Sequence, residues 1–178
     1  MSTDDLASPS GERLQLLRRL GFGDLEHDSH VPFLSHLLGT RRVLVEWGER
    51  PALCDAGLFH SAYGTEYFPV DSPATRDEVR AVIGDDAEQV AWLWCTIRRD
   101  TLELGEEGSV VETRDGSVLE LDASRTSDVV TLWAADTVEQ IDRMAPDERD
   151  FARSLGRVLH VASPSARSAV NAVIDDFS

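Results

Sequence analysis

The chain has 178 residues, of which 42% are apolar, and this size and composition are typical of one folded domain with a substantial core. Its formal net charge of −16 repels phosphate backbones, so we expect no nucleic-acid polymer as a partner. The sequence has no apolar run of the roughly 18 residues that a membrane span needs, and its acidic start is unlike a secretion signal. We therefore expect a cytoplasmic protein that does not engage a membrane.

Most of the sequence has the residue pattern of α-helices, which predicts a mostly α-helical fold. Residues 1–10 lack periodicity and are expected to form a disordered tail, followed by a single domain over residues 11–178. Apolar residues recur at helical spacing after residue 12, and proline and glycine then mark the starts and ends of the next segments. Helices are predicted over residues 12–20, 32–47, 51–64, 75–83, 85–99, 127–141, 146–160 and 164–177.

One segment departs from the helical pattern. Residues 108–122 alternate apolar and polar side chains on both sides of Asp115-Gly116, a dipeptide that favours tight hairpin turns. We expect one β-hairpin inserted into the helical fold. Cys54 and Cys95 lie far apart in apolar stretches, which is typical of buried thiols rather than of a disulfide.

Two histidines and one aspartate stand out because each lies in an apolar helical stretch. His36 lies inside the second predicted helix, His60 near the end of the third, and Asp136 near the middle of the helix over 127–141. Imidazole and carboxylate groups are suitable ligands for Zn, Mn or Fe. The alternatives are core histidines that are satisfied by hydrogen bonds, and an aspartate that caps a helix or pairs with an arginine.

The runs SHLLGTRRVLVEWG and ALCDAGLFHSAYG resemble the opening of an HD-domain protein, where a histidine precedes an apolar helix that ends in His-Asp. The later run VVTLWAADTVEQI is similar to the helix that supplies the last metal-binding aspartate in that superfamily. The resemblance implies an HD-like helical bundle that holds a divalent metal ion through His36, His60 and Asp136. The layout is most similar to the hydrolase domain of RelA/SpoT alarmone enzymes, and AGLFHSxYGT also occurs in uncharacterised bacterial proteins.

One departure from the family pattern concerns the residue after His60, which is Ser61 where HD proteins carry the aspartate ligand. A serine hydroxyl is a weak ligand, so His30 and Glu66 are the predicted substitutes. Glu66 and Tyr63 are also the candidate catalytic residues, since the tyrosine hydroxyl can donate a hydrogen bond to a bound oxyanion. The alternatives are a solvated Glu66 and a tyrosine that only packs.

The resemblance to HD proteins implies three alternative functions. The first is a metal-dependent hydrolase that acts on a small phosphorylated or nucleotide-like substrate, with the ion acidifying a bound water. The second is a non-haem di-iron oxygenase, in which His30 and Glu66 help to hold a second ion. The third is a non-catalytic binding or partner protein that has kept the HD scaffold and lost its metal, with Ser61 as the trace of that loss.

Overall fold

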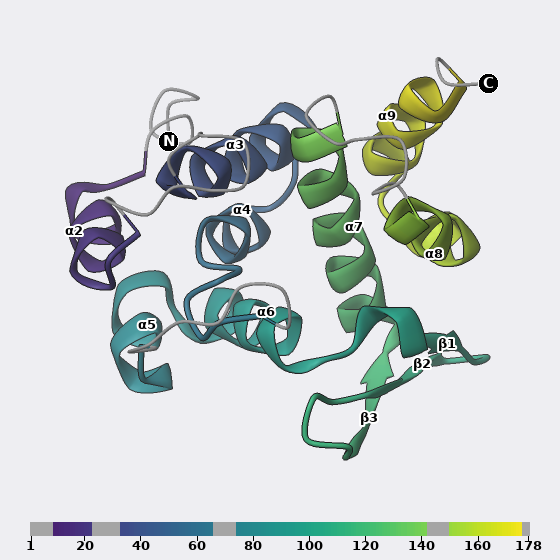
Figure 1. Ribbon diagram of the computed structural model, residues 1–178, viewed down its shortest axis with the longest axis horizontal. Coiled ribbons are helices and arrows are strands. Elements are labelled where there is room, and N and C mark those ends of the chain that lie inside the picture. Colours follow the sequence, from purple (N-terminus) through teal and green to yellow (C-terminus); the bar gives the residue numbers. More distant parts are fainter. Residues whose placement is uncertain (1–8, 23–32, 66–73, 142–149, 176–178) are drawn as a thin grey trace. The chain divides into compact units, whose positions relative to one another are not determined.

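The computed structural model describes residues 9–22, 33–65, 74–141 and 150–175 (Figure 1). The structure is mostly helical with one small antiparallel sheet, as the sequence predicts. It divides into two compact units, Met1–Cys95 and Thr96–Ser178. None of the helices in the described ranges combines the length and apolarity that crossing a bilayer requires. A single domain over residues 11–178 stays a prediction, and most of the predicted tail lies outside the described residues.

The first unit contains five helices among its described residues: α2 (Gly11–Arg19), α3 (Phe33–Glu46), α4 (Pro51–Leu58), α5 (Arg76–Ile83) and α6 (Asp85–Thr96). Gly48, two residues after the end of α3, adopts a positive φ of 75°, and Pro51 occupies the first turn of α4. These two residues reverse the chain within a short loop, so α3 and α4 become contacting neighbours. The structure therefore forms a helix pair in which α3 carries His36 and the end of α4 leads to His60.

Two more helices of this unit are defined by their end signals. Thr75 caps α5 in a capping box, in which its side chain accepts from the backbone of Glu78 and the Glu78 carboxylate accepts from the backbone of Thr75. Gly84, at φ 82°, separates α5 from α6. The apolar core of the unit consists of large, fully buried side chains from several helices: Leu17, Phe22, Phe33, Leu37, Leu44, Leu53, Leu58 and Phe59.

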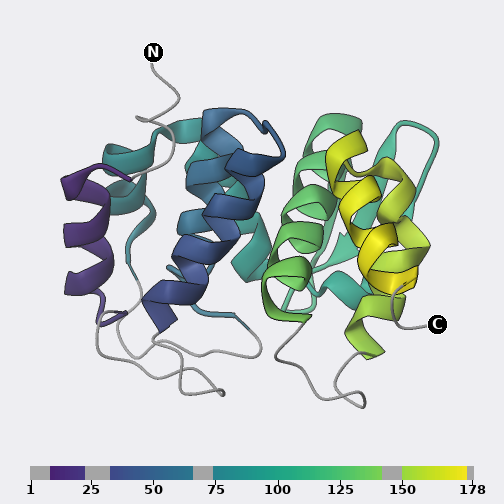
Figure 2. The ribbon, with the colours of Figure 1, turned by 90° about the horizontal axis from the view of Figure 1, so that it is seen from above.

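The second unit combines a three-stranded sheet with helices. Its elements are the 3-10 helix η1 (Arg99–Thr101), β1 (Glu103–Leu104), β2 (Gly108–Glu112), β3 (Val118–Asp122), α7 (Ala123–Gln140), α8 (Asp150–Val158), η4 (Leu159–Val161) and α9 (Pro164–Asp175). The antiparallel strands lie in the order β1-β2-β3, and the β2–β3 register pairs Val111 with Leu119. The helix α9 contacts α7 and runs beside it in both views (Figures 1 and 2).

The predicted hairpin is present and has one additional short strand, β1. Its turn forms at Asp115-Gly116, where Gly116 adopts φ 85° and the Asp115 carboxylate accepts hydrogen bonds from Thr113 and Ser117. The helix after it begins earlier than predicted, because Asp122 ends β3 and caps α7 by accepting a hydrogen bond from the Arg125 backbone at 2.8 Å. Ser127, where the sequence predicted that this helix begins, is therefore inside α7, and the predicted start is wrong.

Candidate metal site

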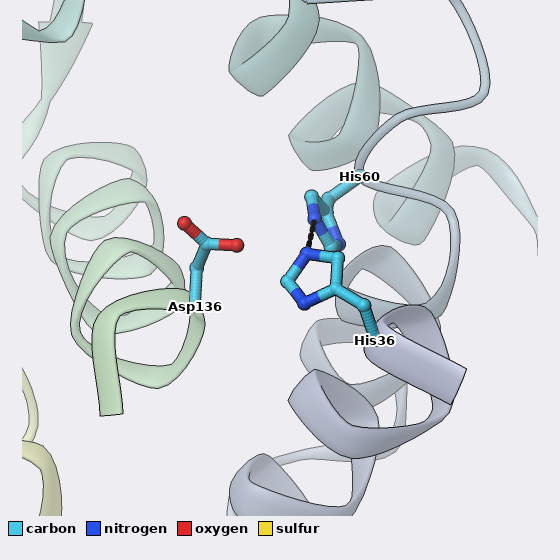
Figure 3. A group of neighbouring side chains, drawn as sticks. All are labelled: His36, His60 and Asp136. Atoms are coloured by element: carbon cyan, nitrogen blue, oxygen red, sulfur yellow. Dashed lines mark hydrogen bonds between the residues drawn. The ribbon is translucent and has the colours of Figure 1, made fainter. Parts of the chain in front are cut away.

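A buried pair of histidines joins α3 to the end of α4. His36 and His60 are 3% and 2% exposed, and their Nε2 atoms lie 3.1 Å apart (Figure 3). The two imidazole rings are nearly perpendicular, with an interplanar angle of 88°. The sequence predicted that these two residues come together, and the first unit by itself brings them into contact.

The ring of His60 is held by several contacts around it. His60 follows the last turn of α4, and its Nδ1 lies 2.5 Å from the carbonyl oxygen of Gly57. Since a carbonyl can only accept, Nδ1 carries the proton and Nε2 presents a lone pair in the neutral ring. The Trp94 ring system packs perpendicular to the imidazole with ring centroids 5.8 Å apart, and the Cys95 thiol donates to the His60 carbonyl at 3.0 Å. These contacts fix both the tautomer and the orientation of His60.

The separation of the two nitrogens suits either of two states. In a metal-free pair, Nε2–H of His36 donates to the lone pair on Nε2 of His60. In a metal-bound pair, an ion about 2.05 Å from both nitrogens would give an N–metal–N angle of about 98°, which lies between the octahedral and tetrahedral values. The bond from Nδ1 of His60 to a backbone carbonyl is also the outer contact that metal-binding histidines usually make. The histidine pair therefore has the geometry of two metal ligands.

A second buried polar contact joins the same two helices. The Asp55 carboxylate on α4 accepts a hydrogen bond from Arg13 of α2 at 2.7 Å, and the Nε atom of Arg41 on α3 lies 3.7 Å from it. These two contacts fit one antiparallel alignment of the helices. Arg41 is five residues after His36 along α3, and Asp55 is five residues before His60 along α4. The ion pair thus supports the alignment that places the two imidazoles opposite each other.

Asp136 belongs to the second unit, where it lies on α7 (Figure 3). Its side chain is partly buried, and Gln140, one turn further along the helix, donates to its carboxylate at 2.9 Å. Because Asp136 is well inside α7, the alternative interpretation as the cap of that helix is wrong. Its participation in a site with the histidines is part of the proposal below.

Tyr63 follows α4 and is bound to a buried carboxylate. Its hydroxyl donates to Glu88 on α6 at 2.8 Å, and Glu88 is 1% exposed. Burial, together with this bond to a carboxylate, raises the pKa of Tyr63 far above its ordinary value. The hydroxyl is thus engaged in a contact that stabilises the helices, and a catalytic role for Tyr63 stays a prediction.

The partners of Glu88 were missed by the sequence analysis. Arg76 makes two hydrogen bonds to its carboxylate, from Nε at 2.6 Å and from Nη2 at 2.7 Å, and its guanidinium lies 4.5 Å from the centre of the Trp92 ring. Arg80 lies 3.4 Å from the same carboxylate and also binds exposed aspartates. The only sequence signal for this network is an acidic residue, Glu88, inside an apolar helix.

Some of the remaining predicted residues lie in the described part of the chain and others do not. His30 and Glu66, the predicted substitute ligands, lie outside the described residues. Ser61, the residue after His60, is 3% exposed. The two cysteines are buried thiols that are not joined in a disulfide, as predicted, and burial raises the pKa of Cys54 to about 11.

Comparison with known proteins gives one match. Residues 16–99 match the model of a family described as a domain of unknown function, DUF6817. No curated protein and no solved structure matches the chain. The matched segment contains both histidines, covers most of the first unit and ends before α7. The similarity therefore concerns the helices around the histidine pair, and the resemblance to HD domains stays a prediction.

Proposed function

We propose that the protein is a metal-dependent hydrolase in which His36, His60 and Asp136 hold one divalent ion. The observation that carries the proposal is the buried histidine pair, with two Nε2 atoms 3.1 Å apart and one ring fixed by a backbone carbonyl. A buried imidazole pair without further function would be replaceable by apolar residues, because burying polar groups costs free energy. Two imidazoles and one carboxylate also form a common ligand set of catalytic zinc sites.

Such a site would leave coordination positions for water. A bound divalent ion lowers the pKa of a coordinated water and supplies a hydroxide near neutral pH. Ser61 stands where a second carboxylate would occupy one of these positions, so the site would be more open than that of a typical HD protein. The substrate class, a small phosphorylated or nucleotide-like molecule, is supported by the sequence resemblance to alarmone hydrolases.

A second candidate function is favoured by the same ligand set. Two histidines and one carboxylate with open positions are also the ligands of non-haem iron oxygenases. His30 and Glu66 would be available for a second iron in that case. The two functions differ in the metal and in the co-substrate, since the oxygenase needs Fe(II) and consumes dioxygen.

The first test is the metal content of protein purified without chelator. We expect about one equivalent of Zn or Mn per chain for the hydrolase, and iron for the oxygenase. His60→Ala should lose the metal, because the ion then has one fewer protein ligand and an empty space in place of the ring. His160→Ala is the matched control, because His160 is an exposed histidine on η4. Its metal content should equal that of the wild type.

A wild-type protein that takes up no Zn, Mn or Fe(II), even after incubation with each metal, would contradict both enzymatic proposals. The pair would then be a hydrogen-bonded element of the core, as the third function predicts. If the protein binds a metal, release of phosphate from small phosphate esters by the metal-loaded protein would support the hydrolase. Dioxygen consumption by the Fe(II) form would support the oxygenase instead.

A further inference from the structure

A threonine one helical turn after His36 has an unusual environment. Thr40 is fully buried on α3, and among the described residues its Oγ1 atom has no hydrogen-bond partner. A helical threonine ordinarily donates to the carbonyl four residues earlier, which here would be that of His36. Leaving a buried hydroxyl without a partner is unfavourable, so the position calls for an explanation.

The helix geometry places Thr40 on the side of α3 that faces α4. At about 100° per residue, Thr40 is about 40° around the helix axis from His36 and about 100° from Arg41. Both of those residues contact α4, through His60 and Asp55. Thr40 lies between their two directions, so its side chain belongs to the same interface. Side chains on a helix also lean toward its N-terminus, which carries the hydroxyl toward the turn of His36.

The residues of α4 at this level offer the hydroxyl no side-chain partner. In the register shared by the two polar contacts, Thr40 is level with Ala56, and Gly57 follows. Ala56 has no polar side-chain atom and is fully buried. The carbonyl of Gly57 already accepts the hydrogen bond from His60. The Thr40 hydroxyl is therefore left without a side-chain partner on α4.

We propose that the Thr40 hydroxyl makes a hydrogen bond to an oxygen ligand of the metal ion, a water or hydroxide bound beside His36. The inference rests on the proposed function, since the oxygen ligand is present only when an ion is bound. An ion with three protein ligands keeps such a solvent molecule in an open position. Thr40 is then a positioning residue, which orients the solvent nucleophile without binding the metal itself.

The test compares Thr40→Val with Thr40→Ser and uses Co²⁺ as the probe. Valine keeps the shape of the side chain and removes the hydroxyl, whereas serine retains it. Thr40→Val should raise the melting temperature of the metal-free protein, because no hydroxyl is left without a partner. It should weaken Co²⁺ binding about tenfold, as loss of an outer-sphere contact does. The pH at which the Co²⁺ absorption spectrum changes, when the bound water loses its proton, should move upward.

Thr40→Ser should keep both the affinity and the pH profile of the wild type. Thr40→Ala serves as a second hydroxyl-free variant and should behave like the valine variant toward Co²⁺. A wild type that binds Co²⁺ while Thr40→Val shows the same affinity and pH profile would overturn the role of Thr40 alone. A wild type that binds no Co²⁺ would overturn the metal site itself, and with it this inference.

Discussion

The substitution Glu88→Gln tests whether the buried carboxylate on α6 stabilises the first unit. Glu88 accepts two hydrogen bonds from Arg76, at 2.6 and 2.7 Å, and one from Tyr63 at 2.8 Å. Glutamine keeps one acceptor oxygen, but its amide group would face an N–H donor of Arg76. A hydrogen bond to a charged group contributes about 1.5–3 kcal/mol. Because the Arg76 side chain is 41% exposed and can be hydrated, we expect a loss near the lower end, about 2 kcal/mol.

The assay is thermal and urea denaturation of the metal-free protein. For a chain of this size, about 2 kcal/mol corresponds to a fall of about 4–8 °C in melting temperature. Glu46→Gln is the matched control, because Glu46 is 65% exposed and lies 3.8 Å from Arg42, which is itself exposed. It should leave stability unchanged. Metal binding should be unaffected in both variants, because neither residue belongs to the proposed ligand set.

The pH dependence gives the same prediction an independent check. Burial raises the pKa of Glu88, but hydrogen bonds from Arg76 and Tyr63 and the charges of Arg76 and Arg80 outweigh it and lower the pKa below 4.5. A lowered pKa means that the carboxylate stabilises the folded state above pH 4.5, and that this contribution is lost as pH falls through the folded-state pKa. The difference between wild type and Glu88→Gln should therefore be full at pH 7 and shrink in acid. A difference below about 0.5 kcal/mol at pH 7, within the usual range of surface changes, would refute the reasoning.

Three further predictions concern single positions. Ser61→Asp should strengthen metal binding by adding a carboxylate next to His60, as in the HD pattern that the sequence resembles; equal or weaker affinity in a titration with Zn²⁺ would show that another residue already fills that place. Gly116→Ala should destabilise the second unit by about 1–2 kcal/mol, because alanine disfavours the positive φ of the hairpin turn, and an unchanged urea midpoint would contradict this. Cys54 should react with a thiol reagent at pH 8 only after unfolding, because its raised pKa of about 11 keeps the buried thiol protonated. The protonated thiol stabilises the folded state fully below pH 9.0, and this stabilisation is lost as pH rises toward 11. Rapid labelling of Cys54 in the native protein would contradict that expectation.

Local signals were sufficient for much of the fold. The hairpin turn at Asp115-Gly116 and the break at Gly84 follow from conformations that glycine adopts readily, so they are legible in the sequence. The start of α7 cannot be predicted in the same way, because Asp122 and Ser127 are both good helix caps. The choice between them depends on where β3 ends. Once Asp122 closes the strand and binds the Arg125 backbone, the four residues before Ser127 become helical.

The candidate site shows a similar division. His36 and His60 could be paired from the sequence, because a short loop between two apolar helices makes them antiparallel neighbours. The contact between Arg76 and Glu88 could not, since Arg76 also has acidic neighbours in sequence at positions 77 and 78. In the folded chain Arg76 instead reaches the buried carboxylate of Glu88 on α6, which no local signal indicates. Thr40 was missed for a related reason, because an unpartnered hydroxyl is visible only when every neighbour is placed.

The most direct test of the proposed metal site is a crystal structure of the metal-loaded protein, with anomalous scattering data collected above and below the absorption edge of the ion. The proposal predicts one peak about 2.0–2.1 Å from the Nε2 atoms of both His36 and His60, with the Asp136 carboxylate as the third protein ligand. A peak that touches neither imidazole, or a His36–His60 pair that keeps its direct 3.1 Å hydrogen bond in metal-soaked crystals, would contradict it.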